Sequence, residues 1–346
     1  MTETNETVNI SGEVILALGE SMRTLQDTMI KGFNALTTHN PYESAVAEAI
    51  IEKGKKVTEE TLKDELMESF NKFIKEEYGA LPKTIQIATE HTLGKPIQGL
   101  FHKKFKQILQ VVSANVPLLL VGPAGSGKNH TLEQVAESLG LKFHFTNAVT
   151  QEYKLSGFID AAGKYQETEF YRAFTEGGMF FLDEMDASIP EALINLNAAI
   201  ANRYYEFPIG RVEAHPDFRV VAAANTQGNG ASSKYVGRNQ LDGATLDRFV
   251  QIEFNYDEEI ESQLASSEEL HTFIKSLRSA IDSADGDFIV SMRALINASK
   301  LEKLMTKEEI IDSVILKGMA NEDRRVLIND LPSSNGYVKA LKKMVG

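Results

Sequence analysis

Apolar and polar residues alternate in different ways along the chain, and the change of pattern separates three regions. Between Pro117 and Phe254, short apolar runs are separated by longer amphipathic stretches. This alternation of strand and helix patterns is typical of a parallel sheet covered by helices. We therefore predict an α/β domain over residues 84–256. Its strands are expected at 118–121, 142–145, 179–182, 219–224 and 249–254, and its helices at 100–112, 129–139, 168–176 and 190–202.

Helical periodicity dominates the regions on either side of this domain. From Ser11 to Leu36, apolar residues recur at steps of three and four, which places them in one stripe on a helix. The near-heptad spacing suits either packing onto the same chain or a coiled-coil seam. Residues 11–80 are therefore predicted to form an acidic, all-helical N-terminal module, preceded by a flexible tail at 1–10. Residues 257–346 are also predicted to be helical, with helices at 258–264, 268–281, 292–304, 307–315 and 337–345.

Composition and charge exclude several classes of protein. The net charge of -13 disfavours a general nucleic-acid binder, which would usually present a basic face. The absence of cysteine rules out disulfides, thiolate zinc sites and cysteine nucleophiles. The first residues are polar and acidic, and no apolar run is long enough for a signal peptide or a membrane span. We therefore expect a cytoplasmic protein that does not engage a membrane.

The stretch 117–131, PLLLVGPAGSGKNHT, joins a predicted strand to a predicted helix through a glycine-rich loop. It matches the phosphate-binding loop pattern at seven of its eight positions. In such a loop, backbone N–H groups converge on phosphate oxygens and the lysine reaches the outer phosphates. The residues predicted to bind the nucleotide are Gly122, Pro123, Ala124, Gly125, Ser126, Gly127, Lys128, Asn129 and His130.

The eighth position of the loop departs from the pattern. It should be Ser or Thr, whose hydroxyl ligates magnesium, but it is Asn129. An amide oxygen is an acceptable hard ligand for magnesium, which takes few protein ligands and keeps several waters. Asn129 is therefore a candidate magnesium ligand.

Polar residues also follow two other predicted strands. Asp183 and Glu184 come directly after the apolar run 179–182. In phosphoryl transfer, the first such carboxylate holds the magnesium and the next can polarise the attacking water. Asn225 ends the strand 219–224, where its amide either holds that water or simply begins a turn. Asp183 is therefore the second candidate metal ligand, and Glu184 and Asn225 are candidate catalytic residues.

Three arginines are candidates for stabilising charge on a transferred phosphate. Arg248 precedes the last predicted strand, where it could act from a neighbouring subunit or pair with Asp247. Arg238 is a second candidate for the role in a neighbouring site. Arg293 is expected at the start of a helix, from which it either projects onto the nucleotide or stays in solvent.

A basic cluster falls in the helix expected at 100–112. Its default interpretation is a solvated face, although a contact with adenine or with a neighbouring subunit is open. The cluster consists of His102, Lys103, Lys104 and Lys106.

The motifs GPAGSGK, FFLDE, AAANT, LDRF and SMR, in this order and spacing, resemble those of the AAA+ ATPases, in the MoxR, CobS and dynein-related branch. The resemblance covers about residues 84–305. It implies a P-loop NTPase sheet with a helical lid at 257–346, and ATP and Mg²⁺ as ligands. It also implies a hexameric or similar ring with ATP at the subunit interfaces and an arginine finger acting in trans. Hairpins are expected at 158–165, a feature of this branch, and near 204–211, where the hairpin could face a pore or a partner.

The leading functional hypothesis is a magnesium-dependent ATPase that uses ATP binding and hydrolysis to remodel a macromolecular partner. The acidic charge favours a protein partner over nucleic acid. One alternative is a nucleic-acid-acting ATPase of a phage or defence system, which nucleic acid would stimulate in a salt-dependent way. The other alternative is an ATP-gated assembly scaffold with little hydrolysis, against which the intact Glu184 argues.

Overall fold

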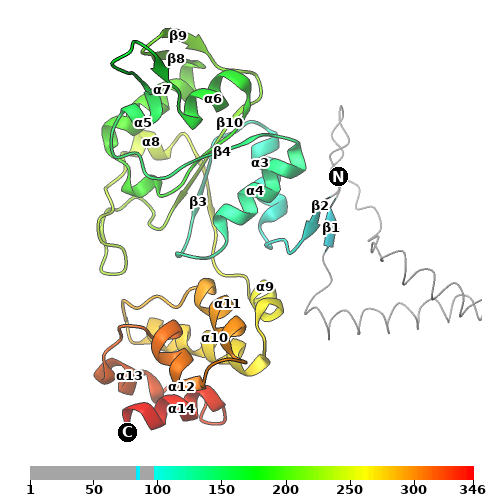
Figure 1. Cartoon of the computed structure of the whole chain (residues 1–346), viewed down its shortest axis with the longest axis vertical. Helices are drawn as coiled ribbons and strands as arrows, with labels where there is room; N and C mark the ends of the chain where they lie inside the picture. Colours follow the sequence, from blue (N-terminus) through cyan, green and yellow to red (C-terminus); the bar gives the residue numbers. More distant parts are fainter. Residues whose placement is uncertain (1–82, 86–96) are drawn as a thin grey trace, which may run out of the picture. The chain divides into compact units, whose positions relative to one another are not determined.

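The computed structural model describes residues 83–85 and 97–346 of the chain (Figure 1). A five-stranded sheet in the order β11-β3-β10-β7-β4 forms the centre of the α/β domain. Every neighbouring pair of strands runs parallel, which confirms the predicted parallel sheet. The tail and the helical module predicted for 1–80 lie outside the described residues. The strands are β3 (Leu118–Val121), β4 (Phe143–Thr146), β7 (Gly178–Leu182), β10 (Phe218–Ala224) and β11 (Val250–Glu253).

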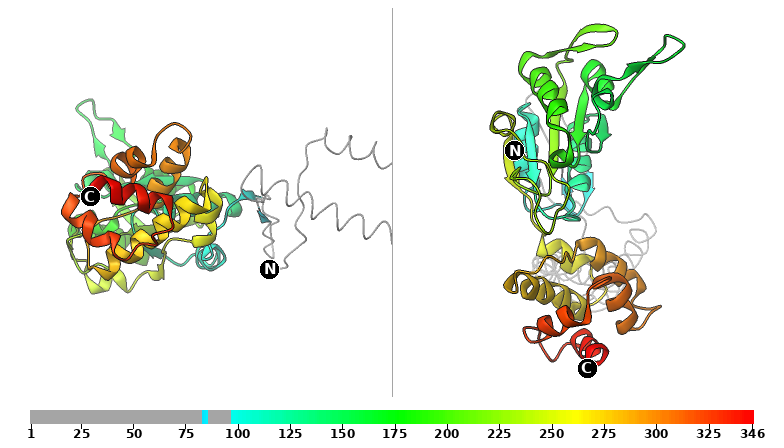
Figure 2. Two further views of the ribbon diagram at one scale, coloured as in Figure 1. Left: turned by 90° about the horizontal axis from the view of Figure 1, so that it is seen from below. Right: turned by 90° about the vertical axis from the view of Figure 1, so that its left-hand side faces the viewer.

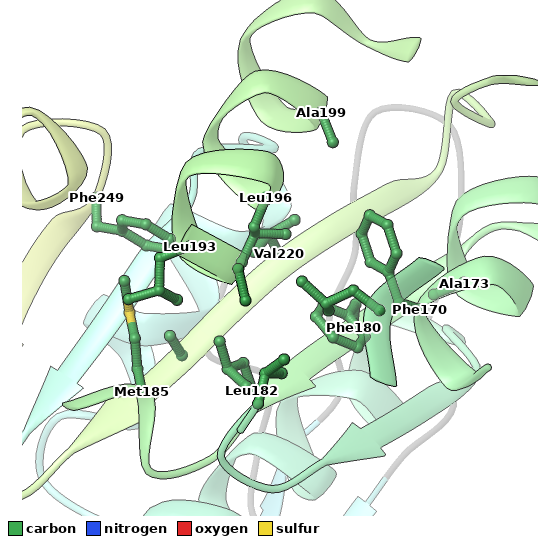
Figure 3. Packing of buried hydrophobic residues seen from close by; sticks show 14 of the residues in the cluster. Phe170, Ala173, Phe180, Leu182, Met185, Leu193, Leu196, Ala199, Val220 and Phe249 are labelled. Carbon is green, nitrogen blue, oxygen red and sulfur yellow. The ribbon is translucent and has the colours of Figure 1, made fainter. Parts of the chain in front are cut away.

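Two apolar layers cover the faces of this sheet, because side chains alternate along each strand. On β7, Phe180 and Leu182 pack with residues of α6 and α7 (Figure 3). Met179 and Phe181 belong to the opposite layer, with residues of α3 and α4. Both faces are therefore buried, which explains the unbroken apolar runs in the sequence. The helices are α3 (Phe105–Ser113), α4 (Lys128–Leu139), α6 (Glu169–Glu176) and α7 (Pro190–Asn202).

The predicted helix at 100–112 begins later than expected, since α3 starts at Phe105. Leu100 and His102 therefore precede the helix instead of forming its first turn. The remaining short elements are β1 (Lys83–Ile85), β2 (Ile97–Gly99), α5 (Tyr153–Ser156), the 3₁₀ helix η1 (Met185–Ala187) and α8 (Gly243–Leu246).

Two antiparallel hairpins project from one end of the α/β domain (Figure 2). The first pairs β5 (Phe158–Ile159) with β6 (Tyr165–Gln166), and the second pairs β8 (Tyr204–Phe207) with β9 (Gly210–Glu213). In the first turn, the Asp160 carboxylate accepts hydrogen bonds from the backbone nitrogens of Ala162 and Lys164, both at 2.9 Å. Both predicted hairpins are therefore confirmed.

The C-terminal region is a helical domain with its own apolar core, as predicted. Within it, the rings of Phe273 and Tyr337 are stacked with their centroids 5.3 Å apart. One helix, α13, is not predicted from the sequence NEDRRVLI, because this segment is mostly polar and only Arg324 and Leu327 are buried. The helices are α9 (Glu258–Leu264), α10 (Glu268–Ser283), α11 (Met292–Leu301), α12 (Lys307–Ile310), the π-helix η2 (Ile311–Ile315), α13 (Asn321–Ile328) and α14 (Gly336–Val345).

None of the helices in the described part of the chain combines the length and the apolar character that a membrane crossing requires.

Candidate nucleotide site

Three neighbouring strands bring the predicted site residues together at one edge of the sheet. The glycine-rich loop follows β3, Asp183 follows β7 and Asn225 follows β10, which lies between the other two. Ligands of open parallel sheets bind outside the carboxyl ends of the strands. The positions predicted from sequence therefore converge where this fold binds ligands.

Lys128 is buried at the centre of this edge, with an exposed fraction of 6%. Its Nζ donates hydrogen bonds to the carbonyls of Gly122 at 2.8 Å and Pro123 at 3.0 Å, and to Asn225 Oδ1 at 3.1 Å. Burial lowers the pKa of Lys128 to about 8, although the charges of Asp183 and Asp186 oppose this shift. The lysine thus connects the loop to the end of β10.

The loop needs glycine at two positions for different reasons. At Gly122, a Cβ atom would lie 1.9 Å from the Phe254 carbonyl oxygen, which leaves no space for a side chain. At Gly127, the φ angle of 96° lies in the left-handed region and precedes the first residue of α4. These constraints let the loop turn sharply into the helix, whose N-terminus favours anions.

Asn129 and Asp183 are adjacent, as a shared metal site requires. The Asn129 Nδ2 donates to Asp183 Oδ2 at 3.0 Å, and the Glu184 backbone nitrogen donates to Asp183 Oδ1 at 2.9 Å. Because the Asn129 amide nitrogen is turned toward the carboxylate, its oxygen is the remaining metal-ligating atom. One carboxylate and one amide oxygen suit magnesium, which takes few protein ligands and is often completed by phosphate and water. In the described part of the chain, no group of three or more His, Cys, Asp or Glu residues could hold a metal ion.

Glu184 forms an ion pair within its own chain. Its Oε1 lies 3.0 Å from Arg238 Nη2, and Arg238 Nη1 lies 3.2 Å from Asp186 Oδ1. Asp186 is completely buried and also accepts hydrogen bonds from the backbone nitrogens of Asn225 and Thr226. Asp186 was not predicted as a site residue, although an acid two residues beyond Glu184 was the available signal.

The other two arginines are exposed. Arg248 Nη1 donates to the Ala244 carbonyl, which is a local contact. Arg293 is the second residue of α11, at the start of a helix as predicted. It lines the cleft described next. Arg248 therefore lies on the surface.

A cleft of about 540 Å³ joins the phosphate-binding loop to the helical domain. Loop residues, Asp183, Glu184 and Asn225 line its polar part. The apolar part was not predicted from the sequence, because it combines Leu100 with residues more than 150 positions further along the chain. The apolar lining residues are Leu100, Ile260, Leu264, Met292 and Ile296.

His102 lies beside this apolar part, whereas the three lysines of its cluster are not among the lining residues. Its ring stacks on Phe254 with centroids 3.8 Å apart. The Nδ1 atom accepts from the Lys104 backbone nitrogen at 3.1 Å, and Nε2 is 2.9 Å from the Asn255 carbonyl. Burial lowers the pKa of His102, so the neutral ring fits this hydrogen-bond pattern. A base bound in the cleft would meet an uncharged imidazole.

The sequence matches one family model and several staphylococcal proteins. Residues 117–249 match the AAA domain of the dynein-related subfamily. An uncharacterized protein of Staphylococcus saprophyticus is 28% identical over 252 residues, covering 65% of this chain and 93% of that protein. An uncharacterized protein of Staphylococcus aureus strain USA300 is 27% identical over 250 residues, covering 63% of this chain and 90% of that one.

Among solved structures, NtrX from Brucella abortus aligns with a TM-score of 0.39 and 14% identity, covering 86% of this chain and 57% of NtrX. This chain therefore spans a little over half the length of NtrX. The family match covers the loop, the Asp183-Glu184 pair, Asn225 and Arg248. Residues 117–249 of this chain are therefore an AAA domain of the kind found in the dynein-related subfamily.

Proposed function

We propose that this protein is a magnesium-dependent ATPase that works as a ring and remodels a protein partner. The observation that carries the proposal is the convergence of Lys128, Asp183, Glu184 and Asn225 on one cleft with an apolar end. Such a cleft offers positive charge and backbone amides to the phosphates, and apolar side chains to the base.

Each residue has a distinct role in this proposal. Lys128 and the loop amides bind phosphate oxygens, and Glu184 accepts the proton of the attacking water. Asn225, whose Oδ1 holds Lys128 Nζ at 3.1 Å, orients that water. Asn129 and Asp183 would hold magnesium, which when bound neutralises the charge of the phosphates.

The ring is proposed because one residue of the motif set, Arg248, is not among the residues that line the cleft of its own chain. Arg248 is exposed and its described contact is local, so its guanidinium is available to a neighbouring subunit. An arginine supplied in trans stabilises charge on the transferred phosphate. Arg293 lines the cleft from the helical domain, where it would contact bound phosphate and transmit nucleotide state.

A protein partner is proposed from charge and exposed apolar side chains. The net charge of -13 disfavours broad contact with a phosphate backbone. The two hairpins expose Phe158, Ile159 and Ile209, each by about half of its surface. Exposed apolar residues on projecting loops suit contact with a polypeptide.

The experiment is steady-state ATP hydrolysis with magnesium over a range of protein concentrations, with Glu184→Gln as control. Turnover per subunit should rise with concentration, because the complete site is shared, and should vanish in Glu184→Gln while ATP binding remains. A wild-type rate no higher than that of Glu184→Gln at every concentration would reject the autonomous ATPase. Stimulation by nucleic acid that weakens with salt, without stimulation by unfolded protein, would reject the protein partner.

A further inference from the structure

Arg238 connects two carboxylates that follow the same strand. Its Nη2 lies 3.0 Å from Glu184 Oε1 and its Nη1 lies 3.2 Å from Asp186 Oδ1. The Arg238 side chain is 12% exposed and that of Asp186 is fully buried, whereas that of Glu184 is 45% exposed. Glu184 is therefore the most accessible member of this group, whereas Arg238 and Asp186 are largely buried.

Asp186 anchors the group to the sheet. Its Oδ2 accepts hydrogen bonds from Asn225 N at 3.1 Å, and from Thr226 N and Thr226 Oγ1, both at 2.9 Å. A buried carboxylate with this many donors keeps a single position, because each lost hydrogen bond would leave a polar group unpaired. Through Arg238, Glu184 is thus tied to the end of β10.

The segment that carries Arg238 also contacts the phosphate-binding loop. The hydroxyl of Tyr235 accepts a hydrogen bond from the Ala124 backbone nitrogen at 3.1 Å. Ala124 belongs to the loop whose amides converge on phosphate oxygens, so a phosphate there would compete with Tyr235 for this donor.

The same segment contacts the helical domain on its other side. Lys234 Nζ lies 3.2 Å from Asp282 Oδ1, and Ser233 Oγ donates to Asp287 Oδ1. Three consecutive residues thus connect the loop and the helical domain just before Arg238. A change at either contact would be transmitted to the ion pair with Glu184.

We infer that Arg238 is a positioning residue that restrains the Glu184 carboxylate within the same subunit, and that ATP turnover requires this ion pair to open. The inference rests on the proposed ATPase function. A carboxylate oxygen held by a guanidinium has a lone pair already engaged, so it is a poorer proton acceptor for water. Because phosphate and Tyr235 compete for the Ala124 backbone nitrogen, opening of the ion pair is coupled to phosphate binding in the loop.

This role differs from that of an arginine finger in trans. A finger must reach the site of another subunit, whereas both guanidinium nitrogens of Arg238 that form ion pairs are engaged in its own chain. The two roles predict opposite effects of removing the side chain. Loss of a restraint accelerates turnover, and loss of a finger slows it by about a thousandfold or more.

The test compares Arg238→Ala and Arg238→Lys with the wild type at saturating ATP. Arg238→Ala should raise kcat about fivefold with little change in KM, which corresponds to about 1 kcal/mol. Arg238→Lys, which can pair with only one carboxylate at a time, should give a smaller increase. Arg172→Ala is the matched control, because Arg172 also bridges two carboxylates, Glu167 and Glu169, but on the exposed surface.

A second measurement does not depend on ATP. Thermal unfolding without nucleotide is recorded for wild type, Arg238→Ala, Glu184→Gln and the double variant. The decrease in Tm caused by Arg238→Ala should be smaller in the Glu184→Gln background, because the two side chains interact. Additive decreases in Tm would show that the two side chains do not interact, and would overturn the inferred restraint.

The outcomes separate the inference from the proposed function. If the wild type and Arg238→Ala are both inactive, the ATPase proposal fails. The comparison of Tm among the wild type, the two single variants and the double variant then decides whether Arg238 restrains Glu184. If the wild type is active and kcat of Arg238→Ala is unchanged or lower, the restraint is rejected.

Discussion

Asp186 Oδ2 lies 2.9 Å from both the backbone nitrogen and the hydroxyl oxygen of Thr226. This contact joins the segment after β7, which includes η1, to the end of β10, and these two segments carry Glu184 and Asn225. Asp186 is not among the residues that line the cleft. The relative position of the two candidate catalytic side chains therefore depends on a carboxylate that would not touch the nucleotide.

Asp186→Asn should destabilise the protein by about 2 kcal/mol. An amide nitrogen would replace one carboxylate oxygen, and the groups that now donate to that oxygen would lose their acceptor. The loss should appear as a lower midpoint of urea unfolding with an unchanged slope. Asp217→Asn makes the same change on a side chain that is 62% exposed, and should have little effect. Equal stability of Asp186→Asn and the wild type would show that the buried hydrogen bonds do not need the charge.

Asn129 should set the magnesium requirement of the site. Its amide nitrogen donates to Asp183 Oδ2 at 3.0 Å, so the amide oxygen is the atom left for the metal. Asn129→Ala should raise the half-saturating Mg²⁺ concentration at least about tenfold, and Asn129→Thr should restore or improve it. Magnesium titrations of turnover and of nucleotide binding would measure this. Asn195→Ala, on α7, is the control, and an unchanged requirement in Asn129→Ala would remove Asn129 from the metal site.

The parts of the site that the sequence predicted are those encoded by short, contiguous patterns. Apolar runs followed directly by a polar residue located Asp183 and Asn225 at strand ends, and the glycine spacing located Lys128. The parallel sheet follows from the same runs, because both of its faces are buried.

The unpredicted parts depend on contacts between distant segments. Asp186 and Arg238 are 52 positions apart, and neither has a local pattern that indicates their ion pair. The apolar lining of the cleft combines Leu100 with Ile260 and Ile296, which look like ordinary core residues of their own segments. Such pairings appear only after tertiary packing has placed the segments.

Lys128 should make nucleotide affinity depend on pH. Burial lowers the pKa of Lys128 to about 8, whereas bound phosphate favours the charged ammonium and raises this pKa. Above about pH 8 the free protein has lost this proton, so binding must take it up, and affinity should fall as pH rises by up to about tenfold per pH unit. Below about pH 7 the lysine is charged in both states, and its contribution should be constant.

Calorimetric titration with ADP between pH 7 and 9.5, in two buffers of different ionisation enthalpy, would measure both the affinity and the proton uptake. The weaker binding of Lys128→Met should lack this dependence. The same pH dependence in Lys128→Met would assign the effect to another group.

Arg248 should act in the site of a neighbouring subunit. If so, Arg248→Ala and Glu184→Gln are each inactive alone, but the first retains an intact Glu184 and the second an intact Arg248. In a head-to-tail ring, random mixing of equal amounts should give about a quarter of the interfaces both intact residues, and turnover should reappear. The control mixes either single variant with the inactive double variant, which carries both Arg248→Ala and Glu184→Gln. No interface in that mixture combines an intact Glu184 with an intact Arg248. Continued inactivity of the first mixture, with subunit exchange shown by a labelled subunit, would place Arg248 in its own site, because each subunit then carries its own defect.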